Sequence, residues 1–207
     1  MGTGCCTEVE KDRTEMGRIV FLMGKSASGK DTIYKKLLED TDLRLKPYVG
    51  YTTRPRREGE IEGREYHFSD EEQMKTFEAA GKLIEKRVYH TVYGDWYYFS
   101  VDTPEVDLDK NDYLYIGTLE SFVPVRDYYG SSRVIPVYIE VEDGLRLMRA
   151  IERERRQDKP GYEEMCRRFL ADCEDFSEEK LSAAKIERRF DNTSLNECLK
   201  EIRDTLL

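Results

Sequence analysis

The sequence has no long apolar segment, few histidines and no cysteine pattern typical of a metal site. No apolar run approaches 18 residues, so we expect no transmembrane helix. The five cysteines are an odd number without metal-ligand spacing, and there are two histidines, which argues against a zinc site. We expect reduced thiols and a cytoplasmic protein. A net charge of −9 argues against a general nucleic-acid-binding protein.

The composition is that of a globular chain whose cationic side chains are concentrated in a few places. The 207 residues, 37% charged and 39% hydrophobic, fit one α/β domain with insertions. Arginines gather around residues 54–57 and again at 149–156, so the chain can hold anions despite its negative charge. Residues 1–15 have no hydrophobic core segment, and Cys6 replaces the Ser or Thr of a myristoylation site. We interpret them as a polar, disordered extension.

The stretch IVFLMGKSASGKDTIYKKLL, residues 19–38, indicates a strand, a glycine-rich loop and a helix. Gly24, Gly29 and Lys30 match the Gly-x4-Gly-Lys pattern, in which backbone N–H groups and the start of a helix bind phosphate. The loop therefore predicts ATP binding, with Lys30 reaching the β- and γ-phosphates. The predicted ATP-binding residues of the loop are Gly24, Lys25, Ser26, Ala27, Ser28, Gly29, Lys30, Asp31 and Thr32.

Asp31 stands where such a loop has a Ser or Thr to hold Mg²⁺. A carboxylate beside triphosphate oxygens is repelled unless a cation lies between them. Two interpretations stay open: Asp31 binds Mg²⁺ directly or through water, or it caps the helix.

The rest of the chain alternates strands with helices, which predicts an α/β fold with a mainly parallel sheet. Residues 50–101 read as antiparallel strands around a helix at 69–80, capped by Ser69 with Glu72 three residues later. Residues 112–119, 133–141 and 185–190 read as further strands. Residues 143–168 form a charged helical stretch broken by DKPG, and residues 194–207 a closing helix. After the break, we expect an apolar stripe to pack on the core: Met165, Cys166, Phe169, Leu170 and Cys173.

A second motif, TTRPRREGEIEGREYHF at residues 52–68, places Arg54 and Arg57 three apart around Pro55. Two guanidinium groups at this spacing can clamp a phosphate, although a basic surface loop would look the same. The motif resembles the GMP-binding signature of guanylate kinases, and the resemblance runs in one order from Met16 to the C-terminus. It implies a three-layer P-loop NTPase core with a small antiparallel GMP-binding insertion and a helical lid. The implied parts are a core at 16–49, 102–142 and 169–207, a GMP-binding domain at 50–101 and a lid at 143–168.

The resemblance also assigns roles to individual residues. It implies that Arg54, Arg57, Tyr66 and Tyr93 hold the phosphate of GMP, supported by Glu60. Glu85 matches the carboxylate that accepts hydrogen bonds from guanine N1 and N2. The implied catalytic residues are Lys30 and the arginines that close over the transferring phosphoryl group, namely Arg149, Arg153 and Arg168. Asn192 matches a residue near the adenine of ATP.

Three positions depart from the family pattern. The first is Asp31. The second is Gly50, where the family has a serine that reads guanine O6, which leaves Tyr51 or Thr52 to replace it. The third is the strand end at residues 114–118, where Ile116 and Thr118 replace acids near GMP and the metal; we count Thr118 with the GMP site. Our hypothesis is that Asp31 takes over part of the missing acidic role.

These inferences predict a Mg²⁺-dependent kinase that transfers a phosphoryl group from ATP to GMP or dGMP. Two alternatives remain: a binding module that has lost catalysis, and a kinase for another nucleoside monophosphate, suggested by Gly50. The complete loop with Lys30 argues against the first, and Glu85 argues for guanine. We expect GMP and ATP as partners, and neither nucleic acid nor membrane.

Overall fold

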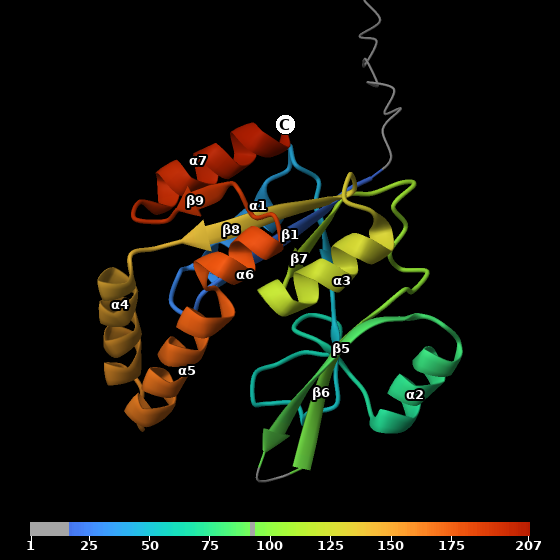
Figure 1. Ribbon diagram of the computed structural model, residues 1–207, viewed down its shortest axis with the longest axis horizontal. Coiled ribbons are helices and arrows are strands. Elements are labelled where there is room, and N and C mark those ends of the chain that lie inside the picture. Colours follow the sequence, from blue (N-terminus) through green and yellow to red (C-terminus); the bar gives the residue numbers. More distant parts are fainter. Residues whose placement is uncertain (1–16, 92–93) are drawn as a thin grey trace, which may run out of the picture.

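The computed structural model describes residues 17–91 and 94–207 (Figure 1). The extension at 1–15 and one predicted site residue, Tyr93, lie outside the described residues.

The core is a five-stranded sheet in which every pairing is parallel, in the order β2-β7-β1-β8-β9. The strands are β1 (Ile19–Gly24), β2 (Lys46–Tyr48), β7 (Tyr113–Ile116), β8 (Val134–Glu140) and β9 (Arg189–Asp191). The central strand β1 is an uninterrupted apolar run and is buried along its whole length, as expected of a parallel strand covered on both faces. The predicted parallel α/β core is confirmed.

Alternate side chains of β1 enter two separate cores, because successive side chains of a strand point to opposite faces. Phe21 packs with residues of α3 (Leu119–Tyr129) and α6 (Glu178–Ala183) on one face. Leu22 packs with residues of α1 (Lys30–Glu39) and α7 (Leu195–Leu206) on the other. The result is a helix–sheet–helix sandwich, visible in Figure 1.

Residues 50–101 form a second, four-stranded sheet in the order β4-β3-β6-β5. Its strands are β3 (Tyr51–Thr52), β4 (His67–Phe68), β5 (Leu83–Thr91) and β6 (Gly94–Val101). The β5–β6 and β3–β6 pairs are antiparallel as predicted, whereas β3 and β4 pair in parallel.

The helix of this insertion, α2 (Glu71–Ala79), does not begin with the predicted Ser69 cap. Its N-cap is Asp70, whose carboxylate accepts a 2.8 Å hydrogen bond from the backbone N–H of Gln73. Ser69 is still held at the edge of the second sheet, where its N–H donates to the carbonyl of Thr52 at 2.9 Å. The helix therefore starts later than the sequence predicted.

Two helices, α4 (Asp143–Arg155) and α5 (Tyr162–Asp175), correspond to the predicted lid, and α5 continues beyond residue 168. The predicted apolar stripe of α5 is wrong at Cys166 and Leu170, which are exposed, whereas Met165 is buried. In Figure 1 the lid helices and the second sheet extend from the same side of the five-stranded sheet. No helix in residues 17–91 or 94–207 is long and apolar enough to cross a membrane.

Candidate active site

The glycine-rich loop connects the carboxyl end of β1 to α1, the edge of a parallel sheet at which ligands bind. Gly29 adopts a left-handed backbone with φ 87°, and a Cβ there would lie 2.3 Å from Nδ2 of Asn192, so only glycine fits. Nδ2 of Asn192 donates to the carbonyl of Ser28 at 2.7 Å, which fixes the loop from behind. Two buried atoms of this site, Oγ of Ser28 and Oδ1 of Asn192, have no hydrogen-bond partner. The described residues therefore leave two buried polar atoms at the base of the loop unsatisfied.

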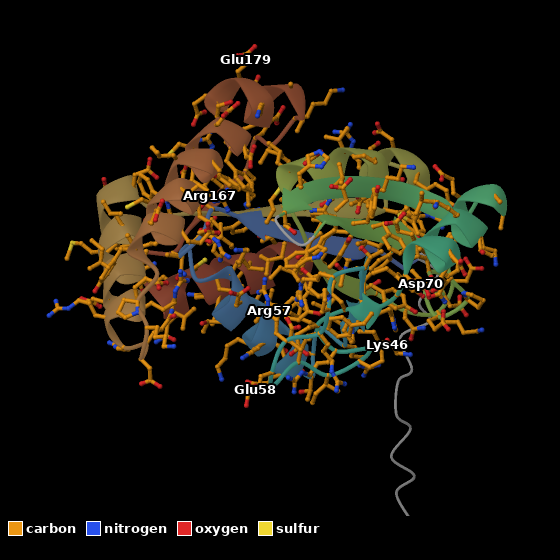
Figure 2. All side chains as sticks on the ribbon, turned by 90° about the horizontal axis from the view of Figure 1, so that it is seen from below. Lys46, Arg57, Glu58, Asp70, Arg167 and Glu179 are labelled. Carbon is orange, nitrogen blue, oxygen red and sulfur yellow. The ribbon has the colours of Figure 1, made fainter. Side chains whose placement is uncertain are left out.

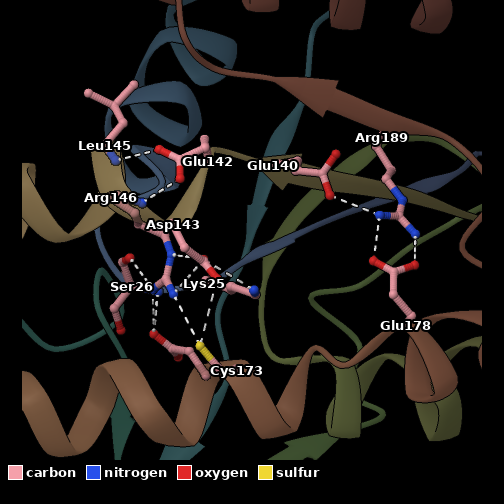
Figure 3. A network of polar contacts seen from close by, with 12 residues as sticks. Lys25, Ser26, Glu140, Glu142, Asp143, Leu145, Arg146, Cys173, Glu178 and Arg189 are labelled. Carbon is pink, nitrogen blue, oxygen red and sulfur yellow. Dashed lines mark hydrogen bonds and ion pairs between the residues drawn. The ribbon is translucent and has the colours of Figure 1, made fainter.

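A buried arginine that the sequence analysis missed, Arg146, connects the loop to the lid (Figure 3). Its Nη1 donates to the carbonyl of Ser26 at 3.1 Å and to Asp172 of α5 at 3.3 Å. Its Nε and Nη2 donate to Asp143 at 3.0 and 2.9 Å, and Asp143 also pairs with Lys25 at 3.3 Å. The backbone N–H of Ser26 donates to Asp172 at 2.7 Å. In this structure α4 and α5 hold the loop through polar contacts on both the N–H and the C=O group of Ser26.

A cavity of about 770 Å³ joins the start of α1 to the second sheet. Its charged lining has four cations and two carboxylates, an excess of positive charge in a chain of net charge −9. A phosphorylated ligand suits such a lining. The lining residues are Lys30, Asp31, Tyr34, Lys35, Leu38, Tyr48, Gly50, Tyr51, Arg64, Glu65, Tyr66, Arg87, Phe99, Tyr115, Ile116, Gly117 and Thr118.

Asp31 lies on the cavity wall next to Lys30 and is exposed. Asp31 is the second residue of α1. The N-cap of this helix is Gly29, so the helix has no side-chain cap hydrogen bond. Asp31 is therefore not the N-cap of α1, although as an acid in the first turn it is placed favourably for the helix dipole. The interpretation as a Mg²⁺ ligand stays a prediction.

The predicted arginine clamp is only partly assembled. Arg54 is 3% exposed, and its Nη1 and Nη2 donate to the two oxygens of Glu60 at 2.7 and 2.5 Å. Arg57 is exposed and contributes its backbone N–H to Glu60 at 2.8 Å; Figure 2 labels it beside Glu58. Neither Arg54 nor Arg57 lines the cavity, whereas Arg64 does. Glu60 thus holds the arginine loop, and Arg64 is a cationic group that the sequence analysis missed.

Tyr66, which the resemblance assigns to the phosphate of GMP, lines the cavity. Burial raises the pKa of its hydroxyl, so the group stays a neutral donor at neutral pH. Thr118 also lines the cavity, and its hydroxyl is the N-cap acceptor of α3, receiving the N–H of Ser121 at 3.3 Å.

A chain of hydrogen bonds crosses the back of the cavity. The hydroxyls of Tyr115 and Ser100 are 2.6 Å apart, and Oγ of Ser100 donates to Oε1 of Glu85 at 2.7 Å. Nε of Arg87 donates to Oε2 of Glu85 at 3.0 Å, and its Nη1 donates to the hydroxyl of Thr118 at 3.1 Å. Arg87 was missed by the sequence analysis, although it lies two residues from Glu85 and hence on the same face of β5.

The structure also shows what surrounds Gly50. A Cβ at this position would lie 3.3 Å from the hydroxyl of Tyr115, so that tyrosine occupies the side on which a serine would project. Thr52 is wrong as the replacement, because its hydroxyl donates to the carbonyl of Tyr97 at 2.9 Å inside the second sheet. Tyr51 lines the cavity.

The predicted lid arginines lie on α4 and α5 without converging on one point. Nη2 of Arg149 donates to the carbonyl of Asn192 at 2.9 Å, beside the loop. Arg153 is half exposed, 3.6 Å from Glu154, and Arg168 is paired with Glu164 at 2.8 Å. A second cavity of about 440 Å³ lies beside Lys25 and is lined by the carboxyl ends of β8 and β9 and the start of α4.

Comparison with known proteins matches these features to one family. The guanylate kinase family model matches residues 16–118, which include the glycine-rich loop and the second sheet. Over 92% of this chain, a guanylate kinase of Anaplasma phagocytophilum is 28% identical and one of Porphyromonas gingivalis 26% identical, covering 84% and 97% of those proteins. The chain belongs to the guanylate kinase family.

Other matches are shorter or show the fold alone. The match to a guanylate kinase of Mycoplasmoides gallisepticum, 33% identical, spans 48% of this chain and about half the length of that relative. The crystal structure of guanylate kinase from Anaplasma phagocytophilum matches with a TM-score of 0.58 and 23% identity, covering 93% of this chain and 86% of that one. This likeness supports the three-layer guanylate kinase fold.

Proposed function

We propose that this guanylate kinase family member transfers the γ-phosphoryl group of ATP to GMP or dGMP, giving ADP and GDP or dGDP. One observation carries the proposal: a single positively charged cavity extends from Lys30, at the end of the phosphate loop, to the second sheet. Donor and acceptor phosphates can therefore meet in one enclosed space. The naming of the matched relatives as guanylate kinases supports the same acceptor.

Transfer of this kind requires positioning and charge neutralisation rather than a general base, because the acceptor phosphate is already ionised at neutral pH. We assign the loop N–H groups and Lys30 to the donor phosphates, with Asn192 and the smaller cavity at the nucleoside end of ATP. Arg149, Arg153 and Arg168 would converge on the transferring group when the lid closes. Closure would also exclude water and limit hydrolysis of ATP.

For the acceptor phosphate we propose Tyr66 and Arg64 on the cavity wall, together with the predicted set of Arg54, Arg57 and Tyr93. Glu60 would act by holding Arg54 and the backbone of Arg57.

We infer that Mg²⁺ accompanies ATP. The donor set fits this ion: Mg²⁺ usually keeps several waters and binds through one or two carboxylates plus substrate phosphates. Asp31 offers one exposed carboxylate beside Lys30, and no group of three His, Cys, Asp or Glu residues suited to a metal occurs in the described residues. An Mg²⁺ ion held by Asp31 would neutralise the charge of the donor phosphates during transfer. We also propose a cytoplasmic location.

The test is release of ADP from MgATP with GMP, dGMP, AMP, UMP or CMP as acceptor. We expect turnover with GMP and dGMP and a fall of about 100-fold or more in Lys30→Ala. Lys36→Ala is the matched control, because Lys36 lies on the same helix, is exposed and pairs with Glu39 at 2.9 Å on the surface.

Each alternative has its own outcome. Binding of GMP without turnover would mean a retired, binding-only module. Turnover with a pyrimidine nucleotide or AMP instead would mean a kinase for another monophosphate.

A further inference from the structure

Arg146 is a buried cation to which the proposed transfer gives no role, and it joins the phosphate loop to both lid helices (Figure 3). The residue is 1% exposed, and its guanidinium carbon lies 4.3 Å from the ring centroid of Phe169. Nε and Nη2 donate to Asp143, and Nη1 donates to Asp172 at 3.3 Å. Nη1 also donates to the carbonyl of Ser26 at 3.1 Å. The guanidinium is therefore held on several sides, and its contact with Ser26 is the one that reaches the loop.

The loop contains a turn whose geometry is unfavourable for its residue. The N–H of Ser28 donates to the carbonyl of Lys25 at 3.2 Å, which closes a turn with two central residues, Ser26 and Ala27. Ala27 has a left-handed backbone with φ 62°, whereas the φ of Ser26 is not positive. A positive φ at the second central position alone is the mark of a type II turn, which normally has Gly or Asn there. Ala27 therefore holds a conformation that a residue with a Cβ adopts when its surroundings impose it.

The contact of Arg146 falls on the peptide unit that distinguishes this turn from the ordinary one. Turns of types I and II differ in the orientation of the central peptide, which here joins the C=O of Ser26 to the N–H of Ala27. Nη1 of Arg146 holds that C=O, and Asp172 accepts the N–H of Ser26 at 2.7 Å. Because the C=O and N–H of a trans peptide point in opposite directions, the N–H of Ala27 is directed away from Arg146. None of the described residues accepts a hydrogen bond from this N–H, which leaves it for an anion at the loop.

We propose that Arg146 is a positioning residue for the donor nucleotide, which keeps the peptide between Ser26 and Ala27 in the orientation that lets the N–H of Ala27 bind phosphate. The inference rests on the proposed function and deepens it, because it assigns the shape of the phosphate-binding backbone to a residue outside the loop. Without Arg146 the turn should relax toward type I, which suits alanine, and this N–H would point to the opposite side. Arg146 acts through Ser26 and Ala27 and contacts no part of ATP in this role.

Calorimetric binding of MgATP to the full chain, without an acceptor, tests this role. Arg146→Met should weaken ATP binding by about 5- to 30-fold, the factor that corresponds to the cost of a left-handed conformation for a residue with a Cβ. Ala27→Gly in the Arg146→Met background should recover most of that loss, because glycine adopts a positive φ without a steric penalty. In the wild-type background the same glycine should shift the Kd severalfold less, since Arg146 already holds the peptide. An arginine needed only for folding would not be replaced by a glycine at a different position.

Arg126→Met is the matched control, because Arg126 makes the same kinds of contact away from the loop. Its Nη1 donates to the carbonyl of Ala184 at 2.8 Å and its Nε to Asp127 at 2.9 Å. Its guanidinium carbon lies 5.5 Å from the ring centroid of Phe122. Loss of Arg126 should lower the free energy of unfolding and leave the Kd for ATP within about twofold of wild type. In both arginine variants the KM for GMP should stay within about threefold, because neither arginine lines the acceptor cavity.

Unchanged ATP binding in Arg146→Met would overturn the inference and leave the proposed function standing. A loss that Ala27→Gly does not recover would overturn it as well, since Arg146 would then act through its charge or through the fold. If wild type binds no ATP, the inference and the proposed function are both wrong. ATP binding with the expected recovery, but without turnover of any monophosphate, would contradict the proposed function alone. Should Arg146→Met fail to fold, Arg146→Lys keeps a cation between the carboxylates but loses the forked donors, and the same recovery by Ala27→Gly is expected.

Discussion

Oδ2 of Asp172, on lid helix α5, accepts a 2.7 Å hydrogen bond from the backbone N–H of Ser26 in the phosphate loop. N–H groups of such a loop are the ones that bind phosphate oxygens. The carboxylate is therefore a competitor for the anionic end of ATP, held in place by Arg146 at 3.3 Å.

Asp172→Asn should tighten ATP binding severalfold, because it removes a negative charge from the loop while keeping an oxygen that can accept the Ser26 N–H. The same change weakens the contact with buried Arg146 and should lower the free energy of unfolding by about 1 kcal/mol. Calorimetry with ATP and urea unfolding measure the two effects. Asp175→Asn is the control on the same helix, since Asp175 is exposed and lies 3.7 Å from Lys180. Weaker ATP binding in Asp172→Asn would show instead that the carboxylate orders the loop for its ligand.

Asp31→Ala should raise the Mg²⁺ concentration that gives half-maximal activity by about tenfold or more, a loss typical of one missing partner around a bound metal. The reason is that Asp31 is the carboxylate on the cavity wall nearest in sequence to Lys30. A titration of activity with Mg²⁺ at saturating ATP measures it. Thr32→Val tests whether the next hydroxyl serves instead. Unchanged magnesium dependence in Asp31→Ala would dismiss the idea that this residue replaces the missing strand acids.

Arg153→Met should reduce kcat by about 100-fold or more with the KM for GMP within about threefold, because we propose that Arg153 acts on the transferring group rather than on the bound acceptor. Steady-state kinetics separate the two constants. Arg155→Met is the matched control: Arg155 is also exposed on α4, but two positions along a helix point to different faces. Equal losses in both variants would mean that only the charge of the lid matters.

Features fixed by local rules were predictable from the sequence. The apolar run of β1, the Gly24 to Lys30 loop and the helical spacing in α7 gave the parallel core, which the structure confirms. The Ser69 cap was wrong because the N–H of Ser69 is bonded to the carbonyl of Thr52 in the second sheet, so the helix begins after Asp70. No local sequence pattern distinguishes a serine that caps a helix from one that is bonded to a neighbouring strand.

The site was less predictable, because pairing between distant side chains decides which groups are available. Glu85 reads as a free carboxylate in the sequence, yet Ser100 and Arg87 take its oxygens. Arg146 lies in a helix with many charges, and only the folded chain shows that it is 1% exposed and bound to Ser26. Such partners are set by the packing of separate elements, which a local motif does not specify.

The ion pair of Glu60 with Arg54 makes the stability of the arginine loop depend on pH. Hydrogen bonds from Arg54 lower the pKa of Glu60 from 4.5 to about 2. A carboxylate whose pKa is lower in the folded state stabilises the fold above the unfolded value, and this contribution disappears as the pH falls from about 4.5 to about 2. Glu60→Gln should lower the free energy of unfolding by about 3 kcal/mol at pH 7, because buried Arg54 loses its charged partner.

The difference in unfolding free energy between Glu60→Gln and wild type should shrink as the pH falls from about 4.5 to about 2, and urea unfolding at a series of pH values measures it. Glu58→Gln, in the same loop and exposed, is the control and should behave as wild type. A difference that stays constant down to pH 2 would mean that Glu60 acts through its shape rather than its charge.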